Sequence, residues 1–205
     1  MIEKTEPNNQ QRSKLILASA SKRRLDLLQS INVFPDEIDP ADIEEKPFRN
    51  EMPRHFALRM AKEKAHRVAS KHPNAYVLAA DTVVCRGRRI LPKAETLSDA
   101  KFCLKFLSGN RHNVWTAVYL ITGNTNATSR SVQTIVKFKR LTEKEVCAYV
   151  KSNEWREKAG GYAIQGYASV FVTWISGSYS NIVGLPLFET NALLESSGYS
   201  KKIRE

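Results

Sequence analysis

An aliphatic run near the start of the chain leads directly into two serines and three cations, and this junction restricts the fold more than any other stretch. Leu15–Leu17 is a continuous apolar run, as expected for a strand covered on both faces. From residue 25 to residue 31, apolar side chains recur on roughly one face of a helix. Ser19 or Ser21 can cap that helix at its N-terminus. The junction therefore predicts a strand, a turn and a helix.

The predicted turn carries an unusual charge. Lys22, Arg23 and Arg24 fall in the first turn of the helix, where the helix dipole favours negative groups. Three cations are unfavourable there unless an anion binds to them and to the free backbone N–H groups. The segment alone leaves two interpretations open: a phosphate or carboxylate site, or a solvated basic helix start.

Strand and helix patterns alternate along the rest of the chain. Turn residues at 123–126 separate two strand-like runs and predict an antiparallel hairpin. Ser98 is expected to cap a helix, Thr142 with Glu145 forms a capping-box pattern, and Pro186 suits the first turn of a last helix. The expected strands cover residues 15–17, 76–85, 112–122, 130–139 and 169–176, and the other expected helices cover residues 53–70, 98–109 and 141–152.

The chain shows no internal repeat, low-complexity tract or long linker. Helices that alternate with strands, some of them paired as hairpins, are typical of an α/β fold with a mixed sheet flanked by helices. We therefore expect one domain over residues 14–199, with a disordered tail over residues 1–13 and a polar tail over residues 200–205.

Composition and charge narrow the classes of function. The formal net charge of +11 implies a polyanionic partner, and leaves nucleic acid, nucleotide and anionic membrane open. No apolar run approaches the roughly 18 residues that span a bilayer, and the N-terminal residues contain no apolar signal core. The three cysteines lie far apart, which argues against a disulfide framework and fits a reducing cytoplasm. The four histidines form no metal-ligand pattern.

Asp81 is the carboxylate with the strongest functional signal. It follows the apolar run at residues 76–80 and precedes Thr82 and further β-branched residues. A charged carboxylate inside a strand is costly to bury without a partner, and ligands of open α/β sheets bind beyond the carboxyl ends of strands. The pattern favours a metal ligand or a general base over a strand-end aspartate that turns the chain.

Three other charged residues are ordinary by pattern alone. Glu44 lies in a polar loop, where a carboxylate is usually solvated. Lys64 stands four residues after Met60 and four before Val68, within the apolar stripe of its predicted helix. Such a lysine either extends to solvent or points into a polar site, and the pattern alone favours extension to solvent. The pattern around Lys93 is typical of a lysine in a turn.

The loop KAGGYAIQGYA, residues 158–168, is the most informative loop. Gly160, Gly161 and Gly166 allow unusual dihedral angles and close approach to a ligand. Gln165 offers a donor and acceptors, which suits reading a base edge. The loop matches neither the Walker nor the dinucleotide-binding pattern, and a structural bulge is the alternative. The chain thus combines cations, candidate metal-binding carboxylates and glycine-rich loops, which together suit a nucleotide polyphosphate. No Cys or Ser is evidently paired with a His, so the pattern favours water, assisted by a metal, as the nucleophile.

Four motifs then occur in order at matching spacing: LILASASKRR, AADTVV, KAGGYAIQG and GSYSNIVGLPLFET. Together they resemble the Maf family, also called septum formation inhibitor proteins, over residues 15–194. The resemblance implies an α/β fold with a central cleft, similar to that of inosine triphosphate pyrophosphatases. It also implies hydrolysis of a nucleoside triphosphate to the monophosphate and pyrophosphate. The KAGGYAIQG form resembles the subgroup acting on dTTP and UTP, whereas the subgroup acting on 7-methyl-GTP carries a different sequence in this loop.

The resemblance also implies roles for individual residues, a homodimer and a divalent metal, Mg²⁺ with Mn²⁺ and Co²⁺ as alternatives. Asp81 matches the family's proton acceptor and, with Glu44, is expected to hold the metal. Lys64 and Lys93 are expected to stabilise developing charge. The residues expected to bind substrate are Ser19, Ser21, Arg23, Arg24, Thr82 and Gln165, of which Arg23, Thr82 and Gln165 match positions associated with substrate choice.

This chain departs from the family pattern at two prolines. Lys22 stands where the family usually has proline, so the turn lacks a preset φ but loses no chemical group. Ala94 follows Lys93 where the family usually has proline, and Pro92 precedes that lysine instead. The orientation of Lys93 is therefore a question for the structure.

Two alternatives remain beside hydrolysis of dTTP and UTP. The first is the same chemistry on modified or noncanonical nucleotides such as 7-methyl-GTP. The second is a non-enzymatic regulator of cell division that acts through protein or nucleic-acid contacts. The sequence has no basic stripe with interleaved aromatic residues, which argues against nucleic acid.

Overall fold

The structure is a computed structural model that describes residues 14–123 and 126–200. The tail expected over residues 1–13, residues 201–205 and the two central residues of the 123–126 turn lie outside this range. In chain order the elements are β1 (Leu15–Leu17), α1 (Lys22–Ser30), β2 (Glu37–Ile38), α2 (Pro53–Ala69), β3 (Tyr76–Arg86), β4 (Arg89–Ile90), α3 (Leu97–Leu107), β5 (Arg111–Thr122), β6 (Asn126–Phe138), α4 (Glu143–Lys151), the 3₁₀ helix η1 (Tyr167–Phe171), β7 (Val172–Ser176), α5 (Tyr179–Val183) and α6 (Leu187–Ser196).

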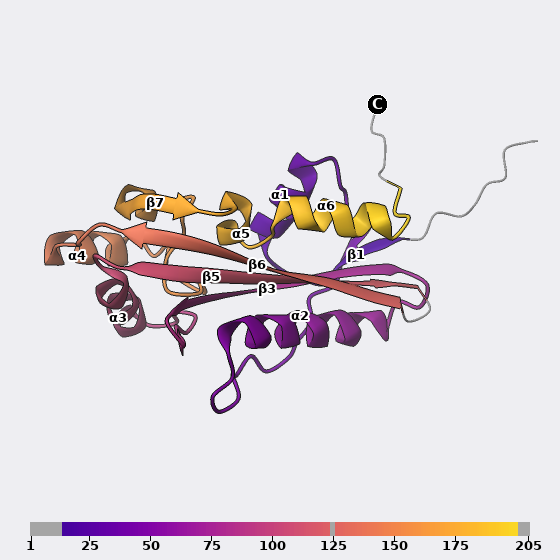
Figure 1. The fold of residues 1–205 in the computed structure, drawn as a ribbon, viewed down its shortest axis with the longest axis horizontal. Helices are drawn as coiled ribbons and strands as arrows, with labels where there is room; N and C mark the ends of the chain where they lie inside the picture. The colour runs from indigo at the N-terminus through magenta and orange to yellow at the C-terminus, as the bar shows by residue number, and fades with distance from the viewer. Residues whose placement is uncertain (1–13, 124–125, 201–205) are drawn as a thin grey trace, which may run out of the picture.

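One twisted sheet organises the molecule (Figure 1). Its strand order is β2-β1-β3-β5-β6-β7, and β4 pairs with β3. β1 runs parallel to β2 and β3, whereas the pairs from β3 to β7 are antiparallel. The sheet is therefore mixed, and the predicted β5–β6 hairpin is confirmed. β3 lies beside β1, β4 and β5 and is therefore a central strand. Asp81 is in the middle of β3 and not at its end.

Helices cover both faces of this sheet because each face carries an apolar layer. α2 lies along one face, and α1, α5 and α6 lie on the other (Figure 1). Met60 and Ala61 of α2 pack with Val83 and Ala117 of the sheet. On the opposite face, the second apolar cluster includes Leu78, Val118 and Leu120 of the sheet and Leu193 and Leu194 of α6. The predicted α/β fold with a mixed sheet flanked by helices is confirmed.

Two helix boundaries differ from the sequence prediction. α3 is capped by Thr96 and not by Ser98, because Thr96 Oγ1 accepts the Asp99 N–H while the Asp99 carboxylate accepts the Thr96 N–H. The capping box expected at the start of α4 is present. The expected last helix, α6, begins at Leu187, so Pro186 is its N-cap and not part of its first turn. A short additional helix, α5, precedes it.

The strand expected over residues 169–176 begins later, at Val172. The preceding residues form η1, in which Ala168 and Phe171 are both fully buried. These two side chains are three residues apart, so a 3₁₀ turn directs both toward the core, whereas a strand would direct them to opposite faces. Packing of this pair therefore overrides the strand pattern.

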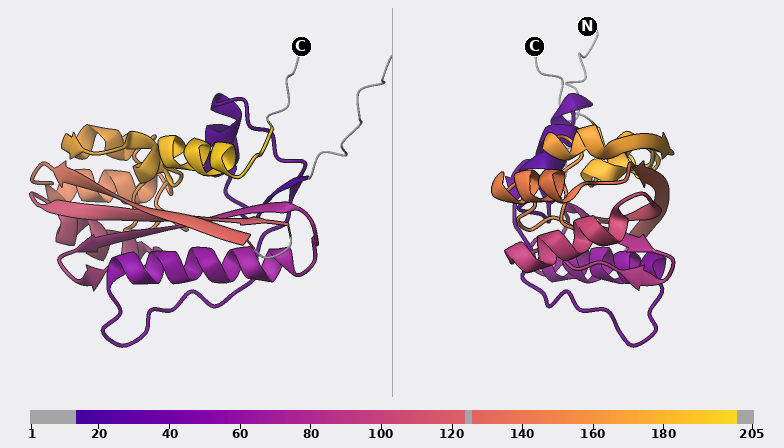
Figure 2. Two further views of the ribbon diagram at one scale, coloured as in Figure 1. Left: turned by 45° about the vertical axis from the view of Figure 1, so that its right-hand side comes forward. Right: turned by 90° about the vertical axis from the view of Figure 1, so that its left-hand side faces the viewer.

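The segment between β2 and α2 forms a long loop on the outside of α2 (Figure 2). Pro40, Ala41 and Glu45, from the first part of this loop, line the main cavity. Among the described residues, no helix is long and apolar enough to cross a membrane.

The glycine-rich loop packs directly against β3. Gly160 has φ +67°, and a Cβ added to it would lie 2.7 Å from Cγ1 of Val84. Gly87, in the turn after β3, has a similar φ of +60° but no atom within 4 Å of such a Cβ. Gly160 is therefore required for backbone conformation and for close packing, and Gly87 for conformation alone.

We predict that Gly160→Ala lowers the free energy of unfolding by about 2–5 kcal/mol, combining a left-handed alanine with overpacking. Gly87→Ala, the matched control, is expected to lower it by only about 1–2 kcal/mol. Urea denaturation of both variants measures the difference. Equal losses in the two variants would show that the loop does not press on Val84.

Candidate active site

A cavity of about 980 Å³ collects most of the residues singled out in the sequence. This volume is ample for a small-molecule site. Its walls come from the β1–α1 turn, from β3 and the segment after β4, from the region between α4 and η1, and from the residues before α6. The predicted site residues that line it are Ser19, Ser21, Arg23, Arg24, Lys64, Asp81, Thr82, Lys93 and Gln165.

The β1–α1 turn forms one wall, as the sequence predicts. α1 begins at Lys22, where the family resemblance leads one to expect proline, and Ser21 is its N-cap without a side-chain capping bond. Ser19 Oγ accepts the Ser21 N–H at 3.2 Å. The described residues provide no hydrogen-bond partner for the Arg23 guanidinium, which also lines the cavity. Burial lowers the pKa of Arg23, but an arginine remains charged at neutral pH.

Arg24 is the structural cation of this wall. Its guanidinium donates to the carbonyl oxygen of Gly184 at 2.8 Å, to Ser19 Oγ at 3.0 Å and to Thr82 Oγ1 at 3.3 Å. Thr82 Oγ1 also lies 3.0 Å from Thr116 Oγ1. Burial lowers the pKa of Arg24, and the charge of Asp81 partly offsets this. Arg24 therefore joins three segments that are far apart in the chain.

A chain of alternating charges runs from the buried Lys64–Asp81 pair through Glu45 to the exposed Lys93. Lys64 Nζ lies 2.6 Å from Asp81 Oδ1 and 2.7 Å from Glu45 Oε1. Glu45 also pairs with Lys93. Lys64 is 7% exposed and Asp81 is 4% exposed, so the apolar stripe of α2 directs this lysine into a polar site and not to solvent. Two carboxylates thus share one ammonium group.

Burial and charge act differently on the two carboxylates. Burial raises the pKa of Asp81 above its usual range, although Lys64 and Arg24 oppose the shift. Burial also acts to raise the pKa of Glu45, but Lys64 and Lys93 together outweigh it and the pKa is lowered. A raised pKa suits a proton acceptor that works near neutral pH.

Glu44 lies away from this cluster. Its side chain is 71% exposed and pairs with Lys46, and it does not line the cavity. Glu45 takes the inward position: its side chain is 26% exposed and pairs with Lys64. No signal in the sequence distinguishes Glu45 from Glu44, and only the structure shows its pairing with Lys64.

Lys93 is held by the glycine-rich loop in spite of the altered prolines beside it. Lys93 and Ala159 form an isolated antiparallel bridge. The Gly160 N–H donates to the Pro92 carbonyl at 3.1 Å, and the Ala94 N–H donates to the Lys158 carbonyl at 3.2 Å. Ala94 is fully buried. Backbone pairing therefore orients Lys93 toward Glu45 without a proline at position 94.

The glycine-rich loop also has a buried polar support that the sequence analysis missed. Tyr162 lines the cavity, and its hydroxyl lies 2.9 Å from His112 Nε2. Burial lowers the pKa of His112 to about 4, so the imidazole is neutral at physiological pH. Burial raises the pKa of Tyr162. No local motif links the two residues, because they lie 50 positions apart.

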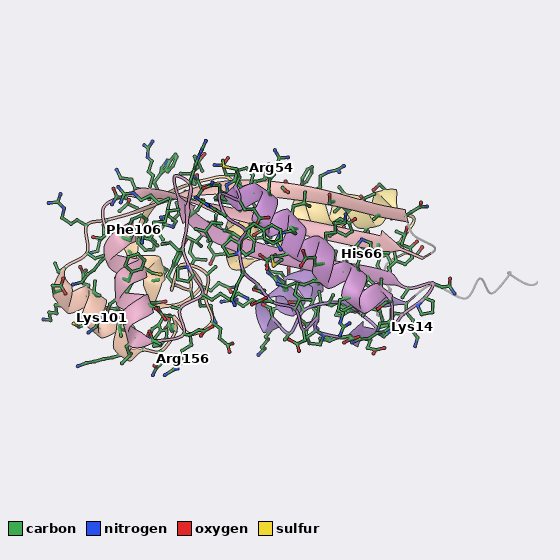
Figure 3. The ribbon with its side chains drawn as sticks, turned by 90° about the horizontal axis from the view of Figure 1, so that it is seen from below. Lys14, Arg54, His66, Lys101, Phe106 and Arg156 are labelled. Atoms are coloured by element: carbon green, nitrogen blue, oxygen red, sulfur yellow. The ribbon has the colours of Figure 1, made fainter. Side chains whose placement is uncertain are left out.

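The outer rim of the cavity carries charges of both signs. The turn after α4 contributes Arg156 and Lys158 but also Glu154 and Glu157, and Gln165 is exposed beside them. Arg156 lies at the same end of the molecule as Lys101 and Phe106 of α3, whereas Lys14, just before β1, lies at the other end (Figure 3). A polyanion that enters the cavity thus meets its main group of cations at the β1–α1 turn.

The site has too few protein ligands to hold a metal alone. Among the described residues, no group of three or more His, Cys, Asp and Glu side chains could hold one. Asp81 and Glu45 nevertheless converge on the same atom, Lys64 Nζ. Mg²⁺ is usually bound by one or two carboxylates with substrate phosphates and water. The pair therefore fits a metal that arrives with a phosphorylated ligand.

Comparison with known proteins gives a consistent family assignment. Residues 14–197 match the family model described as Maf-like protein. A dTTP/UTP pyrophosphatase from Rhodospirillum rubrum is 58% identical over 185 residues, covering 90% of this chain and 88% of the relative. A dTTP/UTP pyrophosphatase from Caulobacter vibrioides is 57% identical over 185 residues, covering 90% of this chain and 96% of the relative.

A solved structure shares the fold at low sequence identity. A HAM1 protein from Coxiella burnetii superposes with a TM-score of 0.50 at 13% identity, covering 90% of this chain and 99% of that one. This likeness concerns the fold alone, and it agrees with the predicted fold class.

We predict that Lys64→Met lowers the free energy of unfolding at pH 7 by about 3–5 kcal/mol, because Asp81 is left buried without its ammonium partner. The loss should shrink at pH 5. A carboxyl group whose pKa is raised in the folded state stabilises the fold when protonated, and this contribution disappears as the pH rises.

Urea denaturation of wild type and variant at both pH values measures the effect. Lys62→Met, at an exposed position of the same helix, is the control. An equal loss at pH 7 and pH 5 would contradict a charged Asp81 as its source.

Proposed function

The chain belongs to the Maf-like protein family, and we propose on this basis that it hydrolyses dTTP and UTP to the nucleoside monophosphate and pyrophosphate. It is a nucleoside triphosphate pyrophosphatase. The observation that carries the proposal is the buried Asp81–Lys64 pair in the wall of a cavity that also presents Arg23 and Arg24. The pair supplies a proton acceptor, and the arginines supply a binding site for a polyanion.

The triphosphate binds at the β1–α1 turn. Arg23 has its guanidinium available and offers two parallel donors to phosphate oxygens. Ser19 and Ser21 add hydroxyl groups beside it. Arg24 already has protein partners on three of its donor positions, so it contributes charge and holds Thr82 in place.

Asp81 accepts a proton from the water that attacks the α-phosphorus. Burial raises its pKa, which increases its basicity as a carboxylate. The water oxygen forms a bond to phosphorus, the bond to the bridging oxygen breaks, and pyrophosphate leaves. Lys64 and Lys93 stabilise the negative charge that develops on the phosphoryl oxygens. Lys64 stays beside Asp81 before and after Asp81 accepts the proton.

We assign to Glu45 the role that the sequence analysis gave to Glu44. Asp81 and Glu45 would hold a divalent cation, Mg²⁺ or alternatively Mn²⁺ or Co²⁺, together with phosphate oxygens. Such a cation supplies charge neutralisation on the phosphates during attack. The support for this assignment is that Glu45 shares Lys64 with Asp81, whereas Glu44 pairs with Lys46 at the surface.

Base choice is assigned to Gln165 and Thr82. Gln165 is exposed and lines the same cavity as the phosphate-binding turn. Its amide can donate and accept in one plane, which suits the edge of a pyrimidine. A cytoplasmic location, which the scattered cysteines indicate, and a homodimer, which the family resemblance implies, stay predictions.

The test of substrate choice is pyrophosphate release from dTTP, UTP, CTP, GTP, 7-methyl-GTP and ITP, with and without Mg²⁺. We expect metal-dependent turnover of dTTP and UTP. Turnover of another base in their place would keep the chemistry and overturn the choice of base. No turnover of any nucleotide by folded protein would overturn the enzyme proposal and favour a regulatory protein.

Asp81→Asn tests the proton acceptor. We expect kcat for dTTP to fall at least about 100-fold, because the amide cannot accept the proton, while the affinity for dTTP stays within a few-fold. Turnover assays and isothermal titration measure the two effects. Asp26→Asn, at an exposed position on α1, is the matched control and should retain full turnover. Full turnover of Asp81→Asn would exclude the role given to this residue.

A further inference from the structure

The segment that carries Gln165 forms a tight turn whose ends are held from outside. The Gly166 N–H donates to the Ala163 carbonyl at 3.1 Å, which closes a four-residue turn with Ile164 and Gln165 at its centre. Ile164 is buried and Gln165 is exposed. The direction of the Gln165 side chain therefore depends on how this turn is fixed to the rest of the molecule.

α4 and the residues just after it hold both sides of the turn. The Tyr149 hydroxyl accepts the Ala163 N–H at 3.0 Å, two residues before Gln165. Glu154 Oε2 accepts the Tyr167 N–H at 2.7 Å, two residues after Gln165. The Tyr149 and Tyr167 rings also stack, with their centroids 6.1 Å apart.

Glu154 packs directly on the turn at Gly166. A Cβ added to Gly166 would lie 2.0 Å from Glu154 Oε2 and 2.7 Å from its Cδ. The carboxylate therefore packs on the backbone of Gly166 as well as on the Tyr167 N–H. A larger residue at position 166 would displace this carboxylate from the Tyr167 N–H.

Glu154 itself is held on a rigid support. The next residue, Trp155, is fully buried, and its indole N–H donates to the Val150 carbonyl at 2.8 Å. The Glu154 N–H donates to Ser152 Oγ at 3.3 Å, and the Ser152 hydroxyl donates to the Tyr149 carbonyl at 2.7 Å. Tyr149 is fully buried within the core. Both contacts to the turn thus start from one packed unit.

We propose that Tyr149 and Glu154 are positioning residues that clamp the turn and thereby set the discrimination between bases by Gln165. The effect on base choice rests on the proposed function, whereas the contacts that form the clamp do not depend on it. The two residues act through the backbone amides on either side of Gln165, although Glu154 also lines the cavity. Their loss therefore affects the choice and affinity of nucleotide and leaves the chemical step intact.

Kinetics with UTP and CTP measure base discrimination, because these nucleotides differ only at one edge of the pyrimidine ring. In Glu154→Ala and in Tyr149→Phe, we expect the ratio of kcat/KM for UTP to that for CTP to fall about tenfold, mainly through KM for UTP. Glu154→Gln keeps an oxygen that can accept the Tyr167 N–H and should retain most of the discrimination. Glu143→Ala, at an exposed position of α4, is the matched control.

Hydrogen exchange without nucleotide tests the clamp independently of activity. We expect the amides of residues 162–167 to exchange faster in Glu154→Ala and Tyr149→Phe than in wild type, with no change in Glu143→Ala. Unchanged exchange in both variants would overturn the clamp. Faster exchange with an unchanged UTP-to-CTP ratio would overturn its role in base choice.

The same measurements separate this inference from the proposed function. A wild-type protein that hydrolyses none of the nucleotides would overturn the proposed function and with it the role of the clamp in base choice. Exchange in the ligand-free variants would still decide whether Tyr149 and Glu154 hold the turn.

Discussion

The ammonium group of Lys64 is the contact on which the rest of the site depends, because it lies between two carboxylates that would otherwise repel each other. It connects α2 with β3 through Asp81 and with the loop outside α2 through Glu45. Glu45 continues the connection to Lys93 and so to the glycine-rich loop. Lys64 thus links α2 directly with β3 and with the loop outside α2, and through Glu45 and Lys93 with the glycine-rich loop.

The fold follows from local sequence patterns to a large extent. Apolar periodicity locates the long helix α2 and the strands of the central sheet, and turn residues identify the hairpin of β5 with β6. The differences arise where two local signals compete. At the start of α3, Thr96 with Asp99 satisfies more backbone groups than Ser98 can. Near residue 169, burial of Ala168 and Phe171 outweighs a strand-like run.

The site is less accessible to sequence reasoning. Family resemblance identifies Asp81 and Lys64, whereas periodicity alone favours extension of Lys64 to solvent, which the structure shows to be wrong. No pattern distinguishes Glu45 from Glu44, since both are loop carboxylates and only a partner on α2 selects one of them. Supports such as His112 and Glu154 depend on contacts between distant segments, and a single sequence contains no signal for such contacts.

The contacts of Arg24 have a consequence for the order of events during synthesis. Its bond to the Gly184 carbonyl joins residues 160 positions apart. Until the segment around Gly184 has been synthesised, Arg24 lacks this acceptor and the pocket lacks the wall that Gly184 provides. A chain synthesised only as far as residue 180 therefore has its arginine-rich turn but no complete pocket.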